Sequence, residues 1–364
     1  MKPAASGHDL SLNARLTAHG AVSTSLASCS DRALSELLDT AVPMGSGIGG
    51  KSALLEVAGR PVFVKRVPLT DLEQRPENVR STANLFDLPL FSHYGVGLIG
   101  APGFGAWREL AVHTTTTNWV LAAEYEGFPL MYHWRVLPDS IALPEELADV
   151  ERAVAYWDGG LQVRRRIEEL GQASSSVALF LEYIPHNLHQ WLGIQIDAGG
   201  GVADQACAMV EKNLQAGIAF MNAKGLLHFD AHFENILTDG RRLYFADYGL
   251  AISSQFDLSG MEAEFLDLHQ DYDRWYAATY YVNWLITALH GCRGEERHAL
   301  VRAYAQGERP TGVPTEAAAI IARHAPVAAA VSDFNRKFQR ESRQTPYPVK
   351  QIRQLSERHS WPAS

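Results

Sequence analysis

The sequence predicts an α+β protein in which a small β-rich lobe precedes a larger helical lobe. Short apolar runs bounded by glycine and proline, typical of strands, lie mostly before residue 185. From about residue 261 the pattern is mostly helical. Strands followed by helices are typical of this class. We therefore expect a weakly structured segment over residues 1–29, the β-rich lobe over 30–184 and the helical lobe over 185–364.

The composition narrows the classes of partner. The chain has 364 residues, of which 46% are hydrophobic, and a net charge of −9, so a broad surface for nucleic acid is not expected. Its three cysteines lie far apart and predict neither a disulfide framework nor a zinc site. No run of about 18 apolar residues and no signal-like segment occurs. We expect a cytoplasmic protein without nucleic-acid or membrane partners.

Several elements of the first lobe follow from local patterns. Ser30 is a suitable N-cap for a helix over 30–41, and two apolar runs around the turn "AGRP" predict a hairpin over 53–67. Residues 66–105 are irregular and rich in Pro, Gly and Asn, and we interpret them as an insertion. A helix from 107 to about 125, a strand over 128–136, a second helix near 145–170 and a strand over 177–184 complete this lobe.

The second lobe opens with a clear helical pattern. Residues 201–225 are amphipathic and end at Gly225, a typical helix stop. Two motifs follow, "LLHFDAHFENIL" over 226–237 and "RLYFADYGLA" over 242–251.

A glycine-rich stretch, "GSGIGGKS" over residues 45–52, fits two phosphate-binding patterns. The pattern G-x-x-x-x-G-K-S requires a helix that opens at Lys51 and Ser52. The following "ALLEV" suits a strand better, so we interpret this match as accidental. The second pattern, G-x-G-x-x-G, is also met by "GVGLIG" over 95–100, so it does not exclude a turn without a ligand.

The two later motifs strongly resemble the catalytic loop and metal-binding motif of the protein-kinase-like superfamily. "VFVK" resembles the family's lysine strand, and "FLEYI" over 180–184 resembles the hinge between its lobes. Glycine loop, lysine, hinge and both motifs follow the family's order over roughly residues 40–285. The matching residues of the two motifs are His228, Asp230, Asn235, Asp247 and Gly249.

The resemblance implies a two-lobed fold that binds ATP and Mg²⁺. Lys65 would contact the α- and β-phosphates, and Asn235 and Asp247 would hold the Mg²⁺ ion through oxygen atoms. Backbone groups of the hinge would bind adenine, and the loop glycines would bring backbone N–H groups to the phosphates. The residues concerned are Glu182, Tyr183 and Ile184 in the hinge, and Gly45, Gly47 and Gly50 in the loop.

The resemblance also assigns catalytic roles. Asp230 would orient the acceptor hydroxyl and take its proton, while His228 would brace the loop. Lys65 needs a helix glutamate as its partner, for which Glu109 is our choice and Glu151 and Glu168 are rivals. Without the resemblance, Lys65 is also readable as a strand-edge lysine. A transition-metal site at His228 and the histidine four residues later is not expected, because they do not share a helical face.

The acceptor is less clearly indicated. "ENIL" and "DYGLA" look like protein kinases, whereas His232 replaces their lysine and resembles aminoglycoside and choline phosphotransferases. Phe229 stands where many protein kinases carry an arginine that pairs with a phosphorylated segment. The segment after Asp247 is short and lacks A-P-E, with "GME" over 260–262 as a degenerate remnant. His232 is counted among the catalytic residues.

These features predict an ATP- and Mg²⁺-dependent phosphotransferase that acts on a hydroxyl group. A protein Ser/Thr acceptor is placed slightly ahead of a small molecule, and a pseudokinase that binds nucleotide without turnover is the rival from another class. Asp271 or Asp273 matches the aspartate that anchors the family's catalytic loop, although a solvated acidic helix start explains either residue as well.

Overall fold

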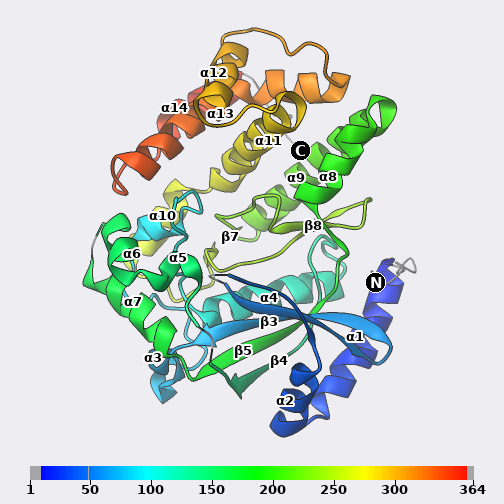
Figure 1. The fold of residues 1–364 in the computed structure, drawn as a ribbon, viewed down its shortest axis with the longest axis vertical. Helices are drawn as coiled ribbons and strands as arrows, with labels where there is room; N and C mark the ends of the chain where they lie inside the picture. Colours follow the sequence, from blue (N-terminus) through cyan, green and yellow to red (C-terminus); the bar gives the residue numbers. More distant parts are fainter. Residues whose placement is uncertain (1–9, 48, 141, 159, 359–364) are drawn as a thin grey trace.

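The computed structural model describes residues 10–47, 49–140, 142–158 and 160–358 of a mixed α+β protein (Figure 1). A five-stranded sheet lies in the N-terminal half, and mostly helices follow it. Its strand order is β1-β2-β3-β5-β4, and every neighbouring pair is antiparallel. The strands are β1 (Val42–Gly47), β2 (Gly50–Val57), β3 (Arg60–Leu69), β4 (Met131–Pro138) and β5 (Ser175–Glu182).

Strand β3 lies at the centre of the sheet and carries Lys65. The predicted hairpin is confirmed, since β2 pairs with β3 around a turn in which Ala58 and Gly59 both have positive φ. This conformation matches the twist of the flanking strands. Strand β5 pairs with β3 on the other side and is buried along nearly its whole length, as its almost continuous apolar sequence requires.

The chain between β3 and helix α4 (Ala106–Leu121) is irregular, as predicted. It contains only short helical turns, namely α3 (Asp71–Gln74), η1 (Pro76–Asn78) and η2 (Leu90–His93). Helix α4 packs against the sheet through Trp107 and Leu110. The single helix expected near 145–170 is instead three helices. Asp149, with a ψ of 86°, separates the first two, and Asp158, with a φ of 60°, separates the second from the third, because neither conformation continues a helix. They are α5 (Glu145–Ala148), α6 (Val150–Tyr156) and α7 (Leu161–Gln172).

Helices α8 to α14 form the other part of the molecule, with the long α9, α11 and α13 packed against one another. Helix α9 ends shortly before Gly225, which has a φ of 72° and acts as the predicted stop. The bounds are α8 (Leu188–Ala198), α9 (Gly200–Ala223), α10 (Gly260–Leu268), α11 (Tyr272–His290), α12 (Gly294–Ala305), α13 (Thr315–Arg340) and α14 (Val349–Arg358).

Two small antiparallel sheets frame the candidate motifs. The pair β7 with β10 and the three strands β6-β8-β9 fix both ends of the loop over 228–235 and of the loop over 246–251. The strands are β6 (His186–Asn187), β7 (Leu226–Leu227), β8 (Ile236–Thr238), β9 (Leu243–Phe245) and β10 (Ile252–Ser253). Both loops are therefore held between paired backbone segments.

The N-terminal segment corrects the sequence prediction. Residues 12–27 form helix α1 (Leu12–Ala27), which packs along β4, so the expectation of weak structure over 1–29 is wrong there; residues 1–9 lie outside the described range. The short helix predicted at Ser30 is confirmed as α2 (Asp31–Asp39). The periodicity of α1 was hard to detect because its buried face begins with an arginine, Arg15, followed by Ala18, Val22 and Leu26.

Arg15 explains why this helix is held in place. Its guanidinium donates from Nε and Nη2 to the carboxylate of Glu182 at 2.9 and 2.8 Å, and its remaining N–H groups reach the carbonyls of Glu126 and Phe128. Neither side chain is more than 4% exposed. A buried charge pair is tolerated only when its hydrogen bonds are made, as they are here.

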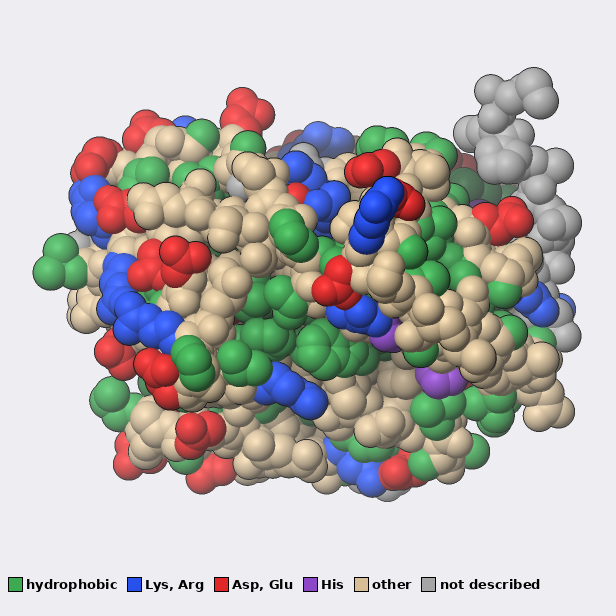
Figure 2. Space-filling model, turned by 90° about the horizontal axis from the view of Figure 1, so that it is seen from below, with side chains coloured by type: hydrophobic (Ala, Val, Ile, Leu, Met, Phe, Trp, Pro, Cys, Tyr) green, Lys and Arg blue, Asp and Glu red, His purple; other side chains and the backbone are tan. Residues whose placement is uncertain are grey.

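Charged side chains of both signs are interspersed on the face that Figure 2 shows, with hydrophobic side chains grouped near its middle. Within the described part of the chain, no helix combines the length and the apolar character needed to cross a bilayer.

Replacing Arg15 with Met should lower the free energy of unfolding by about 3–5 kcal/mol, because it leaves the Glu182 carboxylate buried without its cation. Urea denaturation measures this loss. The matched control is Arg32→Met, whose side chain is 89% exposed in an ion pair with Glu36, and which should change the free energy by less than ~0.5 kcal/mol. Equal losses in both variants would contradict the buried pair.

Candidate active site

The loop over 228–235 is anchored by a buried aspartate on helix α11. Asp273 accepts hydrogen bonds from the backbone N–H of His228 at 2.6 Å and of Phe229 at 2.8 Å. Burial raises the pKa of Asp273 to about 6, although these two bonds act against the rise. The choice left open by the sequence is thus decided, since Asp271 instead accepts a hydrogen bond from Arg353.

His228 joins the two loops. Its Nε2 lies 3.0 Å from the carbonyl oxygen of Ala246, and burial lowers its pKa to about 4, so the ring is neutral at pH 7. Phe229 and Asp247 both have a φ of 63°, an unfavourable conformation for residues other than glycine. Such conformations persist where the surrounding structure enforces them, often at functional sites.

Lys65 lies between two carboxylates from different parts of the chain. Its Nζ is 2.6 Å from Oε1 of Glu109 on α4 and 2.9 Å from Oδ1 of Asp247. The predicted pairing of Lys65 with Glu109 is confirmed, whereas the rivals Glu151 and Glu168 both pair with Arg164. The interpretation of Lys65 as a simple strand-edge lysine is therefore wrong.

The electrostatics of this triad favour its charged form. Burial alone would lower the pKa of Lys65, but Asp247 and Glu109 outweigh it and raise the pKa above its ordinary value. Burial would raise the pKa of Asp247, yet Lys65 holds it at about 2. Burial raises the pKa of Glu109 to about 6 despite the lysine. At neutral pH the site thus has a fixed cation and an ionised Asp247.

Asp230 lies on the same side of the molecule. The side-chain amide of Asn235 donates to the backbone carbonyl of Asp230 at 3.0 Å and to its Oδ2 at 3.1 Å. The other oxygen, Oδ1, is buried, and the hydroxyl of Tyr276 also donates a hydrogen bond to this carboxylate. Burial raises the pKa of Asp230 to about 7, and the negative charge of Asp247 adds to the rise.

His232 is held beside Asp230 rather than in contact with it. Its Nε2 is 3.8 Å from Oδ2 of Asp230, and its Nδ1 is 2.9 Å from Glu234, which also accepts a hydrogen bond from Tyr280. Burial would lower the pKa of His232, but Glu234 and Asp230 raise it above its usual value. A raised pKa favours the protonated, positively charged form of the His232 ring beside Asp230.

A cavity of about 260 Å³ lies next to this cluster of charged groups, although Lys65 itself is not among the described residues that line it. Glu109, Asp230 and Asp247 line it together with backbone-rich segments. The predicted residues that lie in its wall are Glu109, Asp230, His232, Asn235, Asp247 and Gly249. Gly95, from the second G-x-G-x-x-G match, also lines it, as do Gly49, Glu146 and Arg166, which the sequence did not indicate.

The glycine loop contributes through a different glycine from those expected. Gly49 lines the cavity, and a Cβ built on it would lie 2.9 Å from Nζ of Lys65. Gly45 and Gly47 lie in β1 and are not among the residues that line this cavity. Gly50 is needed for the hairpin, because its φ is 111° and a Cβ would lie 2.0 Å from the carbonyl oxygen of Arg66.

The same hairpin decides between the two phosphate-binding patterns. Lys51 and Ser52 lie within strand β2, so no helix opens at them. Nζ of Lys51 instead donates to the backbone carbonyl of Ser140 at 3.2 Å. The match to G-x-x-x-x-G-K-S is accidental, as we interpreted it from the sequence.

The hinge-like residues lie apart from the cavity. The described residues that line it include none of Glu182, Tyr183 and Ile184. The Glu182 side chain is engaged by Arg15, and its N–H donates to the carbonyl of Leu130 at 2.7 Å. Glu182 and Tyr183 instead line a small separate hollow beside α1. The assignment of these three residues to adenine binding stays a prediction.

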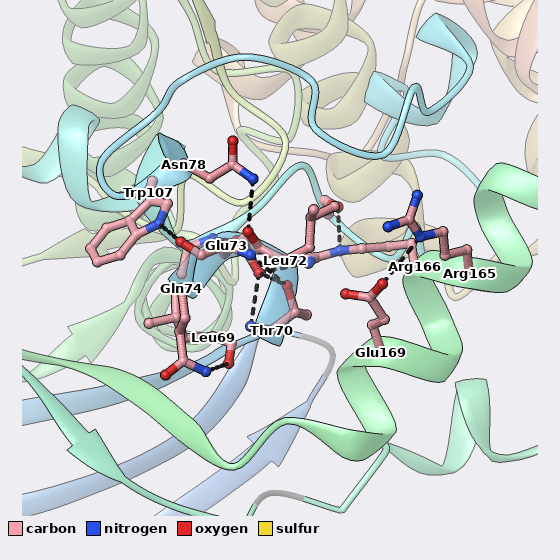
Figure 3. A network of polar contacts seen from close by, with 12 residues as sticks. Leu69, Thr70, Leu72, Glu73, Gln74, Asn78, Trp107, Arg165, Arg166 and Glu169 are labelled. Atoms are coloured by element: carbon pink, nitrogen blue, oxygen red, sulfur yellow. Dashed lines mark hydrogen bonds and ion pairs between the residues drawn. The ribbon is translucent and has the colours of Figure 1, made fainter. Parts of the chain in front are cut away.

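A buried network around Glu73 fixes the start of α4 and hence the position of Glu109 (Figure 3). Oε1 of Glu73 accepts the N–H of Ala106 at 2.8 Å, and its backbone carbonyl accepts the indole N–H of Trp107 at 2.8 Å. Its Oε2 pairs with Arg166 of helix α7 at 3.0 Å. Only its capping box, Thr70 with Glu73, is a local pattern, because the other partners of Glu73 are 33 and 93 residues away.

The donor set fits a nucleotide triphosphate with a hard divalent cation. In the described part of the chain, no group of three or more His, Cys, Asp or Glu side chains is placed to hold a metal by itself. Asn235 and Asp247 offer two oxygen ligands, and Mg²⁺ is commonly held by one or two protein groups together with substrate phosphates. Lys65 supplies positive charge, and the absence of a Cβ at Gly49 lets Nζ of Lys65 lie beside it, at 2.9 Å from where that Cβ would be.

Comparisons with known proteins add no family. Neither the models of protein families nor the curated proteins include a match to this chain. The proposal below therefore stands on the fold and on the geometry of the site.

Replacing Asp230 with Asn should stabilise the ligand-free protein by about 1–3 kcal/mol at pH 8. The pKa of about 7 exceeds the ordinary value, so the folded state disfavours the ionised aspartate, at ~1.4 kcal/mol per pKa unit before allowance for the 20% exposure of its side chain. The gain should shrink as the pH falls from 7 toward 4, because wild type is then neutral in the folded state.

Urea denaturation from pH 5 to pH 8 without nucleotide or metal tests this dependence. Asp333→Asn, which removes a half-exposed carboxylate paired with Arg302, is the control and should give a small, flat difference. An equally flat difference for Asp230→Asn would contradict the raised pKa.

Proposed function

We propose that this chain is an ATP- and Mg²⁺-dependent phosphotransferase of two-lobed, protein-kinase-like architecture that moves the γ-phosphate to a hydroxyl. One observation carries the proposal. Lys65, Glu109 and Asp247, from three separate elements, meet within 2.6 and 2.9 Å beside a cavity that Asp230 and Asn235 also line. Phosphoryl transfer needs charge neutralisation and positioning more than covalent chemistry, and these groups supply both.

Each residue has a distinct task in this proposal. Glu109 holds the Lys65 ammonium in position to neutralise phosphate oxygens, and Asn235 and Asp247 hold Mg²⁺. When bound, the ion would neutralise charge on the phosphate oxygens. Asp230 orients the acceptor hydroxyl and receives its proton, for which a pKa of about 7 is well matched to neutral pH. His232 adds positive charge beside the transferred group.

The segment after Asp247 and the loop before it are held by contacts that need no phosphate group. Phe229, at the position of the arginine that many protein kinases use, stacks on Tyr272 with ring centroids 4.4 Å apart. Helix α10 is tied to α4 by a buried ion pair of 2.5 Å between Arg108 and Glu262. This pair lies next to Glu109 in sequence, so it supports the placement of the site's glutamate. We therefore propose an enzyme whose segment is already ordered before any modification.

Lys65→Met should lower the rate of phosphate transfer or release from ATP–Mg²⁺ at least 100-fold, because a buried cation beside the phosphates is lost. Radiolabelled ATP, with labelled protein, peptide and metabolite fractions and free phosphate counted separately, provides the measurement. The matched control is Lys51→Met, which should stay within about threefold of wild type. If Lys51→Met is the damaging change, or if wild type does not exceed the Asp230→Asn background, the proposal fails.

ATP should raise the melting temperature by several degrees when Mg²⁺ is present, and Asp247→Asn should remove most of the Mg²⁺-dependent part of this shift. Asp333→Asn should respond like wild type. Stabilisation that needs no Mg²⁺ and survives Asp247→Asn would instead support the pseudokinase, a nucleotide-binding protein without turnover.

A further inference from the structure

The segment over residues 94–105, here called the acceptor wall, crosses the site directly opposite Asp230. It belongs to the insertion between β3 and α4, and its residues make up a large share of the lining of the 260 Å³ cavity. Those that line it are Tyr94, Gly95, Gly97, Gly100, Ala101, Pro102, Gly103 and Gly105. An acceptor hydroxyl that reaches Asp230 must therefore fit beside this segment.

Gly95 is the residue of the acceptor wall that lies directly against the Asp230 carboxylate. A Cβ built on Gly95 would lie 2.1 Å from Oδ1 of Asp230 and 2.7 Å from its Cγ. Because no real Cβ comes so close, only glycine allows the carboxylate to keep this position. The same Oδ1 is buried, so the wall shields this oxygen of the proposed base from solvent.

The wall is tied down along its length, unlike a loose surface loop. Tyr94 hydrogen-bonds His269 through its hydroxyl at 2.7 Å. Backbone groups of the wall bond to partners from α5, α6, α7, α13 and the loop after Asp247. These pairs are Val96 with Gln339, Leu98 with Tyr156, Gly100 with Glu146, Gly103 with Arg166, and Phe104 with Gly249. Helices α5, α6 and α7 thus buttress the wall through Glu146, Tyr156 and Arg166.

We propose that the acceptor wall restricts the acceptor to a small hydroxyl compound and excludes a polypeptide, with Gly95 as the residue that positions Asp230. This inference rests on the proposed phosphotransferase and deepens it. The cavity of about 260 Å³ is below the ~300–1,000 Å³ typical of drug-sized ligands, and in the proposed function it must also receive phosphate groups, so the space left for an acceptor is small. An extended chain on both sides of a serine would need an open groove where the buttressed wall stands.

Substitution of Gly95 separates this role from a general loss of structure. Gly95→Ala should lower kcat at least 10-fold by displacing the Asp230 carboxylate, while KM for ATP stays within about threefold, since small misplacements of catalytic groups are costly. Gly193→Ala is the matched control, because a Cβ there meets nothing within 4 Å, and it should leave both parameters unchanged. Unchanged kcat in Gly95→Ala would overturn the positioning role.

A double-mutant cycle, measured by thermal unfolding, tests the contact between Gly95 and Asp230 independently of activity. Gly95→Ala should lower the melting temperature by at least ~4 °C in the wild-type background. It should lower it by less than half as much in the Asp230→Ala background, where the carboxylate that clashes with the new Cβ is gone. Equal losses in both backgrounds would show that the contact does not exist and would overturn the inference, whatever the activity.

The acceptor class is tested with full-length protein, labelled ATP and Mg²⁺. The probes are dephosphorylated casein and a degenerate Ser/Thr peptide library on one side, and glycerol, glucose, ethanolamine and water on the other. We expect Asp230-dependent transfer to small alcohols or water and none to polypeptides. Peptide labelling above the Asp230→Asn background would overturn the exclusion while leaving the phosphotransferase intact. The absence of any Asp230-dependent transfer or phosphate release would overturn the proposed function, and the acceptor assignment with it.

Discussion

The buried ammonium of Lys65 is the interaction on which the rest of the site depends. Removing a cation from water is costly, and the structure offsets this cost with two carboxylates, Glu109 at 2.6 Å and Asp247 at 2.9 Å. These three groups lie on a central strand, a helix and a loop, so displacing Lys65 would leave the buried carboxylate of Glu109 without its cation. The pair of loops that carries Asp247 and Asp230 is thereby fixed relative to the sheet.

Around this triad, the fold uses further buried charges to hold elements that are distant in sequence. Arg15 joins the N-terminal helix to the end of β5, Arg108 joins α4 to α10, and Arg166 joins α7 to Glu73. Each guanidinium can satisfy several carbonyl and carboxylate groups at once, which suits a planar donor with five N–H groups. The orientation of α4, and so of Glu109, is thus determined from two sides.

The irregular segment before α4 and helices α5 to α7 both belong to the surroundings of the site. Residues 94–105 pass over Asp230, and helices α5 to α7 support them through hydrogen bonds and through the packing of Trp157. Their combined effect is to enclose the reacting carboxylate on the side where an acceptor would approach. A proposed phosphotransferase with this enclosure would gain protection from water at the expense of a smaller range of acceptors.

The sequence alone indicated the main central strands, several helices and the residues that make up the candidate site. Periodicity and turn residues indicated the β2–β3 hairpin and α9, and the spacing within "HFDAHFENIL" and "FADYGLA" indicated Asp230, Asn235 and Asp247. Sequence order could not choose Asp273 over Asp271, since both lie at the same helix start, and Glu109 was only one of three partners for Lys65.

Tertiary structure decided the features that arise from contacts between distant residues. The N-terminal helix was missed because its buried stripe starts with Arg15, whose partner Glu182 is 167 residues away. The roles of Gly49 and Gly95 depend on what a Cβ would meet, Lys65 in one case and Asp230 in the other, and no local pattern records that distance. Local propensity acts within a few residues, whereas burial and close approach are properties of the assembled chain.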